Sequence, residues 1–119
     1  MPKKAWRNPN SIAKFAFKLI EKMNNLYIVA LFRFKENMVI DALEILKRLV
    51  IETRKEEGCL QYDLVEDNEH QGVFYILELW ETREHHHQHS VTEHLLNFRQ
   101  QAAPLFAEAV QVYKGAKIF

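Results

Sequence analysis

The chain has 119 residues, a formal charge of zero and an apolar fraction of 48%. This length predicts one domain with a modest core, and the apolar fraction excludes a disordered chain. The single cysteine, Cys59, excludes an intrachain disulfide and a cysteine-based zinc site. A single cysteine is compatible with the reducing cytoplasm, which is the location that we expect. We interpret Cys59 as a small buried side chain rather than a nucleophile.

The charge is uneven along the chain. Residues 1–25 hold six basic side chains against Glu21 alone, a net charge of +5, so residues 26–119 carry −5. An acidic domain argues against nucleic-acid binding. No uncharged run approaches the roughly 18 residues that a membrane span needs, and lysines interrupt any apolar segment of a secretory signal. We therefore divide the chain into a basic extension, 1–25, and a domain, 26–119.

The extension contains a predicted amphipathic helix. Asn10 or Ser11 can cap a helix that begins at Ile12, and Asn24–Asn25 can end it. Its apolar face consists of Ile12, Phe15, Ala16, Leu19, Ile20 and Met23. We expect this helix to dock on the domain or on a partner subunit. Attachment to a membrane surface and an extension poorly ordered in solution are the alternatives.

The predicted elements of the domain follow the order β-α-β-β-α-β. Runs of aromatic and β-branched residues predict strands at 26–35, 59–67 and 73–81, and a shorter pattern predicts a last strand at 109–116. This order is typical of an α+β, ferredoxin-like fold, in which one four-stranded antiparallel sheet carries helices on one face.

Three helices are predicted between these strands. An apolar stripe indicates the first from Asn37 to about Glu57, with Gly58 as its C-cap residue. Thr82 can cap a short helix, and Thr92 can cap a longer one to about Glu108. Pro104 can bend or break the last helix.

Two of the predicted strands, 26–35 and 73–81, are apolar on both faces. In strand 26–35, Leu26, Ile28, Ala30, Phe32 and Phe34 lie on one side, and Tyr27, Val29 and Leu31 lie on the other. Strand 59–67 alternates, with Leu60, Tyr62 and Leu64 on one face. An exposed apolar sheet face would promote aggregation. We therefore predict a homodimer packed sheet to sheet, with a ligand cavity enclosed by the sheet and the helices.

Three segments together resemble a known family. Glu57-Gly58-Cys59-Leu60-x-Tyr62 enters the second strand, and Glu78-Leu79-Trp80-Glu81 closes the third. The spacing His89-x-x-Thr92-x-His94-x-x-x-Phe98 follows in the helical segment. Over roughly residues 26–117 the chain resembles the antibiotic biosynthesis monooxygenase (ABM) domain family, a branch of the dimeric α+β barrel superfamily.

The resemblance implies a small dimer with a cavity for an aromatic or otherwise small oxygenated compound. Family members include quinol and polyketide oxygenases that use molecular oxygen without flavin, metal or haem. Others degrade haem, and others process a small signalling sugar phosphate. The haem-degrading members use an asparagine on the first strand. The predicted first strand of this chain has no asparagine, and the next one along the chain is Asn37. This difference argues against haem degradation.

Cofactor-free oxidation makes physical sense for an electron-rich phenol or quinol. Once such a compound is deprotonated, it can itself reduce oxygen, so the protein need only bind it, remove a proton and exclude water. Glu78 is a candidate base, because burial in an apolar strand would raise its pKa. An ion pair with Arg33 or another cation is the alternative for this carboxylate.

His89 and His94 match the spacing of the family, which favours them as further acid/base residues. In the alternative, one of them packs or caps at the helix junction. We expect Tyr62, Trp80 and Phe98 to bind the substrate, with core or interface packing as the alternative for these aromatic residues.

The histidine run at 85–87 does not predict a metal site. Consecutive residues on a helix point about 100° apart and cannot share one ion. His85 and His89, at positions i and i+4, could share an ion, and Glu93 could complete the set of ligands. Two histidine ligands alone are weak evidence for a metal site. We therefore predict no metal and no other cofactor. His70 lies in a predicted turn, and we expect it to be solvated.

The sequence thus favours a cofactor-independent monooxygenase acting on a quinol-like or polyphenolic small molecule with molecular oxygen. A non-oxygenase alternative is a dimeric small-molecule binding or isomerase-like protein that uses the same cavity. A third hypothesis assigns the basic helix an interaction role, at a partner or a membrane.

Overall fold

The computed structural model describes residues 9–119, except for the side chains of residues 9 and 20–23. Residues 1–8 of the extension, and the Ile20 and Met23 side chains of its apolar face, lie outside this description. The helices and strands are α2 (Pro9–Met23), β1 (Leu26–Arg33), α3 (Val39–Thr53), β2 (Cys59–Glu66), β3 (Val73–Trp80), α4 (Arg83–Ser90), α5 (Glu93–Ala102) and β4 (Gln111–Gly115). Short 3₁₀ turns precede α3 at Glu36–Met38 and follow α5 at Ala103–Leu105.

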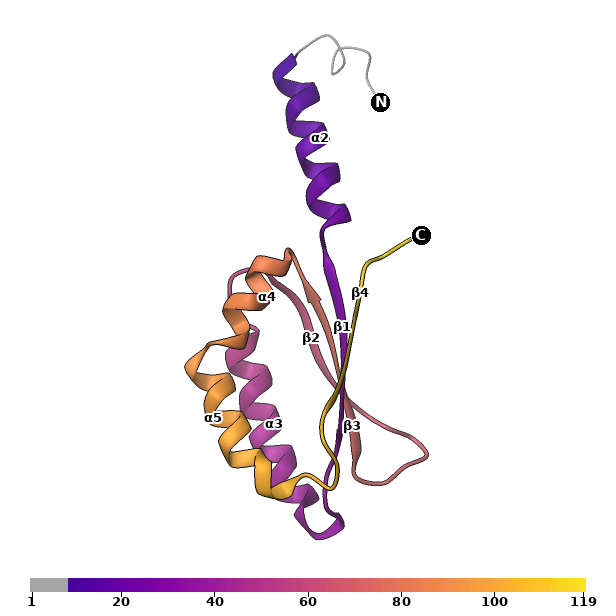
Figure 1. Cartoon of the computed structure of the whole chain (residues 1–119), viewed down its shortest axis with the longest axis vertical. Coiled ribbons are helices and arrows are strands. Elements are labelled where there is room, and N and C mark those ends of the chain that lie inside the picture. Colours follow the sequence, from indigo (N-terminus) through magenta and orange to yellow (C-terminus); the bar gives the residue numbers. More distant parts are fainter. Residues whose placement is uncertain (1–8) are drawn as a thin grey trace.

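The four strands form one antiparallel sheet in the order β2-β3-β1-β4. Helices α3, α4 and α5 cover one face of this sheet (Figure 1). The structure therefore confirms the predicted α+β, ferredoxin-like fold. In the sheet register, Ile28 lies opposite Glu78 of β3 and opposite Lys114 of β4. This register places an acidic and a basic side chain on the same face, on either side of β1.

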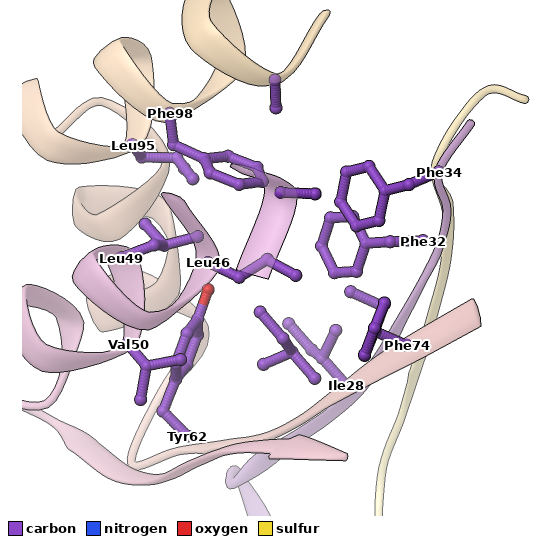
Figure 2. Packing of buried hydrophobic residues seen from close by; sticks show 14 of the residues in the cluster. Ile28, Phe32, Phe34, Leu46, Leu49, Val50, Tyr62, Phe74, Leu95 and Phe98 are labelled. Carbon is purple, nitrogen blue, oxygen red and sulfur yellow. The ribbon is translucent and has the colours of Figure 1, made fainter. Parts of the chain in front are cut away.

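The covered face, which is the face of the sheet under α3, α4 and α5, carries the hydrophobic core. Figure 2 shows Phe32 of β1 and Phe34, which follows β1, facing Phe98 of α5, with Leu46 and Leu49 of α3 between them and Tyr62. The Phe32 and Phe98 rings meet edge to face at 5.9 Å. Aromatic contacts of this kind fix the distance between the sheet and the helices, which leaves room for a pocket further along the same face.

The open face, which is the other face of the sheet, is apolar and partly exposed. Its members are Tyr27, Val29, Leu31, Val65, Tyr75, Leu77, Leu79 and Tyr113. The burial pattern of β1 alternates strictly along the strand, so the predicted division of this strand into two apolar faces is confirmed. No element of residues 9–119 covers the open face in Figure 1.

One predicted face assignment is wrong. The register of β2 against β3 shifts between Cys59 and Gln61, so Leu60 is an extra residue in the strand and is 54% exposed. A bulge of this kind reverses the alternation locally. Cys59 therefore packs with Tyr62 and Leu64 against the core, in the place predicted for Leu60.

Two helices end earlier than predicted. The last helix stops at Ala102, and Pro104 lies in the 3₁₀ turn that follows, as the missing N–H of proline favours. Helix α3 stops at Thr53 rather than Glu57, and Arg54 takes the C-cap position predicted for Gly58. Gly58 adopts a positive φ of 79° at the entry to β2 instead. A Cβ atom there would lie 2.2 Å from the His85 ring, so this glycine permits close contact between β2 and α4.

Helix α2 extends away from the sheet beyond the start of β1 (Figure 1). The expected docking on the domain of the same chain is therefore wrong. Only Asn24 and Asn25 separate the helix from β1. Phe17 and Leu19 are exposed on it. No helix of residues 9–119 is long and apolar enough to cross a membrane.

Candidate functional site

A pocket of about 340 Å³ lies between the covered face and the helices. Its volume is at the lower end of the range for small-molecule sites, roughly 300–1,000 Å³. Its walls are mainly apolar and come from β1, α3, α5 and the segment before β4. The ionisable side chains that line it are Tyr62, Glu78, His86, His89, Arg99 and Lys114.

Glu78 is the buried carboxylate of this pocket. It points to the covered face from the middle of β3 and is only 8% exposed. Burial raises the pKa of the Glu78 carboxyl to about 7, although the Trp80 hydrogen bond and the charge of Lys114 oppose the shift. The Trp80 Nε1–H donates to Glu78 Oε1 at 2.8 Å, which orients the carboxyl group. A carboxyl group with this pKa exchanges protons readily at neutral pH.

The alternative of an ion pair between Glu78 and Arg33 is wrong. Arg33 lies on the open-face side of β1, and its Nε is 3.6 Å from Glu108 Oε2. Lys114 is the cation whose charge acts on Glu78. Because Lys114 and Arg99 line the pocket together with Glu78, the pocket offers both a proton acceptor and positive charge to a bound anion.

His89 lines the same pocket and is held by a carboxylate behind it. Its Nδ1 lies 2.6 Å from Glu56 Oε2, and the same oxygen lies 2.8 Å from His94 Nε2. With Nδ1 engaged by Glu56, Nε2 is the nitrogen of His89 that remains for a ligand. Burial lowers the pKa of His89, although the hydrogen bond to Glu56 opposes this. His89 is therefore a neutral imidazole at pH 7.

His94 lies outside this pocket. It lines a separate hollow of about 170 Å³ over α3 and α5, and it contacts the site through Glu56 and the His89 ring. The two histidines predicted as acid/base residues are thus joined by one carboxylate, and only His89 is in the wall of the pocket.

The three predicted aromatic residues take different places. Tyr62 and Phe98 line the pocket, and burial raises the pKa of Tyr62 well above its ordinary value, so its hydroxyl stays protonated. Trp80 is fully buried and contacts the His89 ring at 4.8 Å. Through this contact and its bond to Glu78, Trp80 positions two residues of the site.

The remaining predicted residues have local structural partners. His85 Nδ1 lies 2.7 Å from the hydroxyl of Thr82, the residue that caps α4 as predicted. His70 is exposed in its turn and bonds Asp67. Cys59 is half-buried, and burial raises the pKa of its thiol to about 11, which keeps it protonated and supports its interpretation as a packing residue.

Sequence reasoning missed Glu56, His86, Arg99 and Lys114. His86 stands three residues before His89, a spacing that places both on one side of a helix, and that signal was available. Burial lowers the pKa of His86 to about 4, so it is neutral in the pocket. Lys114 lies on the covered face of β4, opposite Ile28. Because β4 is short, its alternating pattern predicted this position only weakly. Nothing in the sequence pattern distinguished Glu56 from its neighbour Glu57.

Comparison with known proteins places this geometry in context. Residues 25–101 match the family described as antibiotic biosynthesis monooxygenase. No curated protein sequence matches the chain. Solved structures with similar folds include a conserved protein from Methanosarcina mazei, with 23% identity and a TM-score of 0.78, whose match covers 83% of this chain and 98% of that one.

Two further solved structures are closer in sequence. A protein from Pseudomonas aeruginosa is 28% identical with a TM-score of 0.76, and the match covers 81% of this chain and 96% of that one. A structure described as an antibiotic biosynthesis monooxygenase is 27% identical with a TM-score of 0.75, covering 78% and 98%. In all three the match covers most of this chain and nearly the whole of the other chain.

Proposed function

Because the chain belongs to the antibiotic biosynthesis monooxygenase family, we propose that it is a cofactor-independent monooxygenase acting on a small quinol-like or polyphenolic compound. The observation that carries the proposal is the buried carboxyl of Glu78, which lines an apolar pocket and has a pKa raised to about 7. Such a group can accept a phenolic proton at neutral pH and return it later.

In the proposed reaction the substrate supplies all the electrons. Glu78 takes the proton of a ring hydroxyl, and the electron-rich anion that forms reduces oxygen. One oxygen atom becomes bonded to a ring carbon, the second leaves as water, and the quinol ring is oxidised to a hydroxyquinone. The balance of one quinol and one oxygen molecule to one hydroxyquinone and one water needs no further reductant.

The other groups of the pocket fit the same steps. Lys114 and Arg99 bring positive charge to the anion, and the Tyr62 hydroxyl is a protonated donor. His89, oriented by Glu56, presents its second nitrogen as a proton carrier. The apolar walls exclude water, which keeps the reduced oxygen species from side reactions. His94 would act on His89 through Glu56 rather than touch the substrate.

We also propose that two chains pair through the open face. Tyr27, Val29, Leu77 and Tyr113 are each more than one-third exposed there, in three adjacent strands. A contiguous apolar surface of this kind on a small domain marks an interaction site. A second copy offers the same surface, so a two-fold pair would bury both at once.

The activity is tested by mixing the protein with reduced quinols of one and two rings without oxygen, then adding oxygen and following its uptake. The proposal predicts uptake above the uncatalysed rate for at least one quinol, with a loss of roughly 10²-fold or more in Glu78→Gln. Glu66→Gln, an exposed carboxylate on β2, is the matched control and retains the rate. Uptake at the uncatalysed rate across the panel would refute the oxygenase.

A second candidate function is a proton-transfer enzyme or binding protein without oxygen chemistry. The presence of Glu78 with neutral His86 and His89 around one pocket favours it, since these groups can move a proton between two atoms of a ligand. In that case an enolisable ligand exchanges hydrogen for deuterium in D₂O under anaerobic conditions, and oxygen uptake stays at background.

We further infer that α2 contacts a partner subunit, because Phe17 and Leu19 are exposed on a helix that stands clear of its own domain. Deleting residues 1–24 and measuring both the dimer dissociation constant and liposome binding tests this. A weaker dimer supports the inference, and an unchanged dimer with lost liposome binding supports the membrane alternative.

A further inference from the structure

Three side chains from separate elements converge beside the proposed active site. Glu56 follows α3, His89 lies near the end of α4, and His94 lies near the start of α5. One ligand atom from each residue lies within 4.8 Å of the other two, and His89 Nδ1 and His94 Nε2 are the nitrogens that contact Glu56. Among residues 9–119 this is the one group of three or more potential ligands that meets so closely. The pairing of His85 with His89 and Glu93 considered from the sequence is not this group.

The surroundings of the Glu56 carboxylate favour a bound cation. The ion pairs that Glu56 makes are both with histidines, at 2.6 Å and 2.8 Å, and its side chain is 14% exposed. A carboxylate that carries charge is thus mostly buried between two imidazole rings. Such a charge is costly without a compensating partner. A divalent cation would provide that compensation.

We propose that Glu56, His89 and His94 form a binding site for a divalent transition-metal ion, with Zn²⁺ as the fitting example. Two imidazoles and one carboxylate are ligands that suit zinc and its neighbours and do not suit magnesium or calcium. The inference does not depend on the oxygenase proposal, because that reaction requires no metal.

The geometry needs only a small adjustment. Ligand atoms around a four-coordinate zinc stand roughly 3.4 Å apart, given bonds of about 2.0–2.2 Å. The two N···O distances of 2.6 Å and 2.8 Å must therefore open by less than about 1 Å, and the two imidazole nitrogens, which lie within 4.8 Å of each other, must reach about the same separation. Glu56 lies in the turn between α3 and β2 rather than inside a helix, so its carboxylate can withdraw. His94 is 25% exposed and lines the outer hollow, which gives the ion a way in and water a fourth position.

Binding would change the chemistry of the pocket. In the hydrogen-bonded cluster His89 Nδ1–H can donate to Glu56, which leaves Nε2 as an acceptor. An ion on Nδ1 forces the proton of the neutral ring onto Nε2, so the nitrogen left for the pocket becomes a donor. A metal here would thus act as a switch on His89.

The test uses untagged full-length protein, titrated with ZnCl₂ by calorimetry and with CoCl₂ by visible absorption. The expected result is one ion per chain, a tetrahedral Co²⁺ spectrum, and a higher melting temperature with zinc. His94→Ala and Glu56→Gln should each weaken binding at least about 10-fold. Both residues are partly exposed, so these variants are expected to fold, and circular dichroism checks this. We choose these two variants instead of His89→Ala, because His89→Ala would remove a buried ring from the core.

His87→Ala is the matched control, because His87 is exposed in the neighbouring histidine run. It should bind zinc as the wild type does. Binding that is lost in His87→Ala but kept in His94→Ala and Glu56→Gln would show an adventitious ion only, held by the surface histidines, and would overturn the proposal. Absence of binding to the wild type would overturn it as well.

Discussion

The two faces of the sheet come from the same strands and differ in what they meet. On the covered face, β3 contributes Phe74, Ile76, Glu78 and Trp80 to a core that closes around a pocket. On the open face, the alternate residues of β3, such as Leu77, are apolar and partly exposed. The comparison shows how a strand of eight residues can serve two purposes. One set of side chains builds a ligand site, and the other is available to a second subunit.

The largest difference between the faces should be in stability. Phe74 is 1% exposed, so Phe74→Ala should lower the free energy of unfolding by about 3–5 kcal/mol. Leu77→Ala on the same strand should cost the monomer less than about 1 kcal/mol, because Leu77 is 37% exposed. Urea unfolding at a concentration where the chain is monomeric measures both. Equal losses in the free energy of unfolding for the two variants would contradict this difference between the faces.

Dimer formation should instead be sensitive to substitutions on the open face. Leu77→Glu places a charge in the proposed interface, and we expect it to weaken the dimer by about 100-fold, or about 2.7 kcal/mol. Light scattering after size exclusion should give about 28 kDa for the wild type, twice the 14.2 kDa of the chain, and a single-chain mass for the variant. Leu60→Glu, an exposed leucine at the bulge, is the control. A wild type that remains a single chain at high concentration contradicts the interface.

The covered face should carry the pH dependence. The pKa of Glu78 is about 7 in the folded protein against an ordinary 4.5, so the folded state holds a proton that the unfolded state has lost between these values. Glu78 therefore favours folding less and less as pH rises from about 4.5 to about 7. Its contribution should change by up to about 3 kcal/mol.

Glu78→Gln isolates this effect, because the amide does not titrate. Relative to this variant, the wild type should lose stability across that pH window, even though the lowered pKa values of His86 and His89 act in the opposite direction in both proteins. Lys114, Glu56, Tyr62 and Cys59 are the other ionisable groups that interact with Glu78, and both proteins contain them. A difference between the two proteins that is constant with pH would contradict the raised pKa.

A smaller effect should follow from the entry to β2. Gly58→Ala should cost about 2 kcal/mol, since the residue has a positive φ and its Cβ would meet the His85 ring. Gly115→Ala is the matched control, because a Cβ there meets nothing within 4 Å. Thermal unfolding measures both. A neutral Gly58→Ala would mean that α4 can move away from the covered face at little cost.

Periodicity alone predicted the element order, the two faces of β1, and the threonine caps of α4 and α5, because these depend on local spacing. It also placed Glu78 among buried residues. It failed at Leu60, where a bulge reverses the alternation, and at Gly58, where the conformation depends on contact with a distant helix. Glu56 and Lys114 join the site only through folding of segments far apart in the chain. No local pattern contains that information.

The central claim is that Glu78 is a proton acceptor of neutral pKa inside a ligand pocket. The Trp80 indole N–H reports on it directly, because it donates to the Glu78 carboxyl at 2.8 Å and the chain has one other tryptophan, Trp6. In ¹⁵N-labelled protein its resonance should titrate with a midpoint near pH 7, and this titration should vanish in Glu78→Gln. A resonance that is flat across neutral pH, or that titrates near 4.5, would contradict the account.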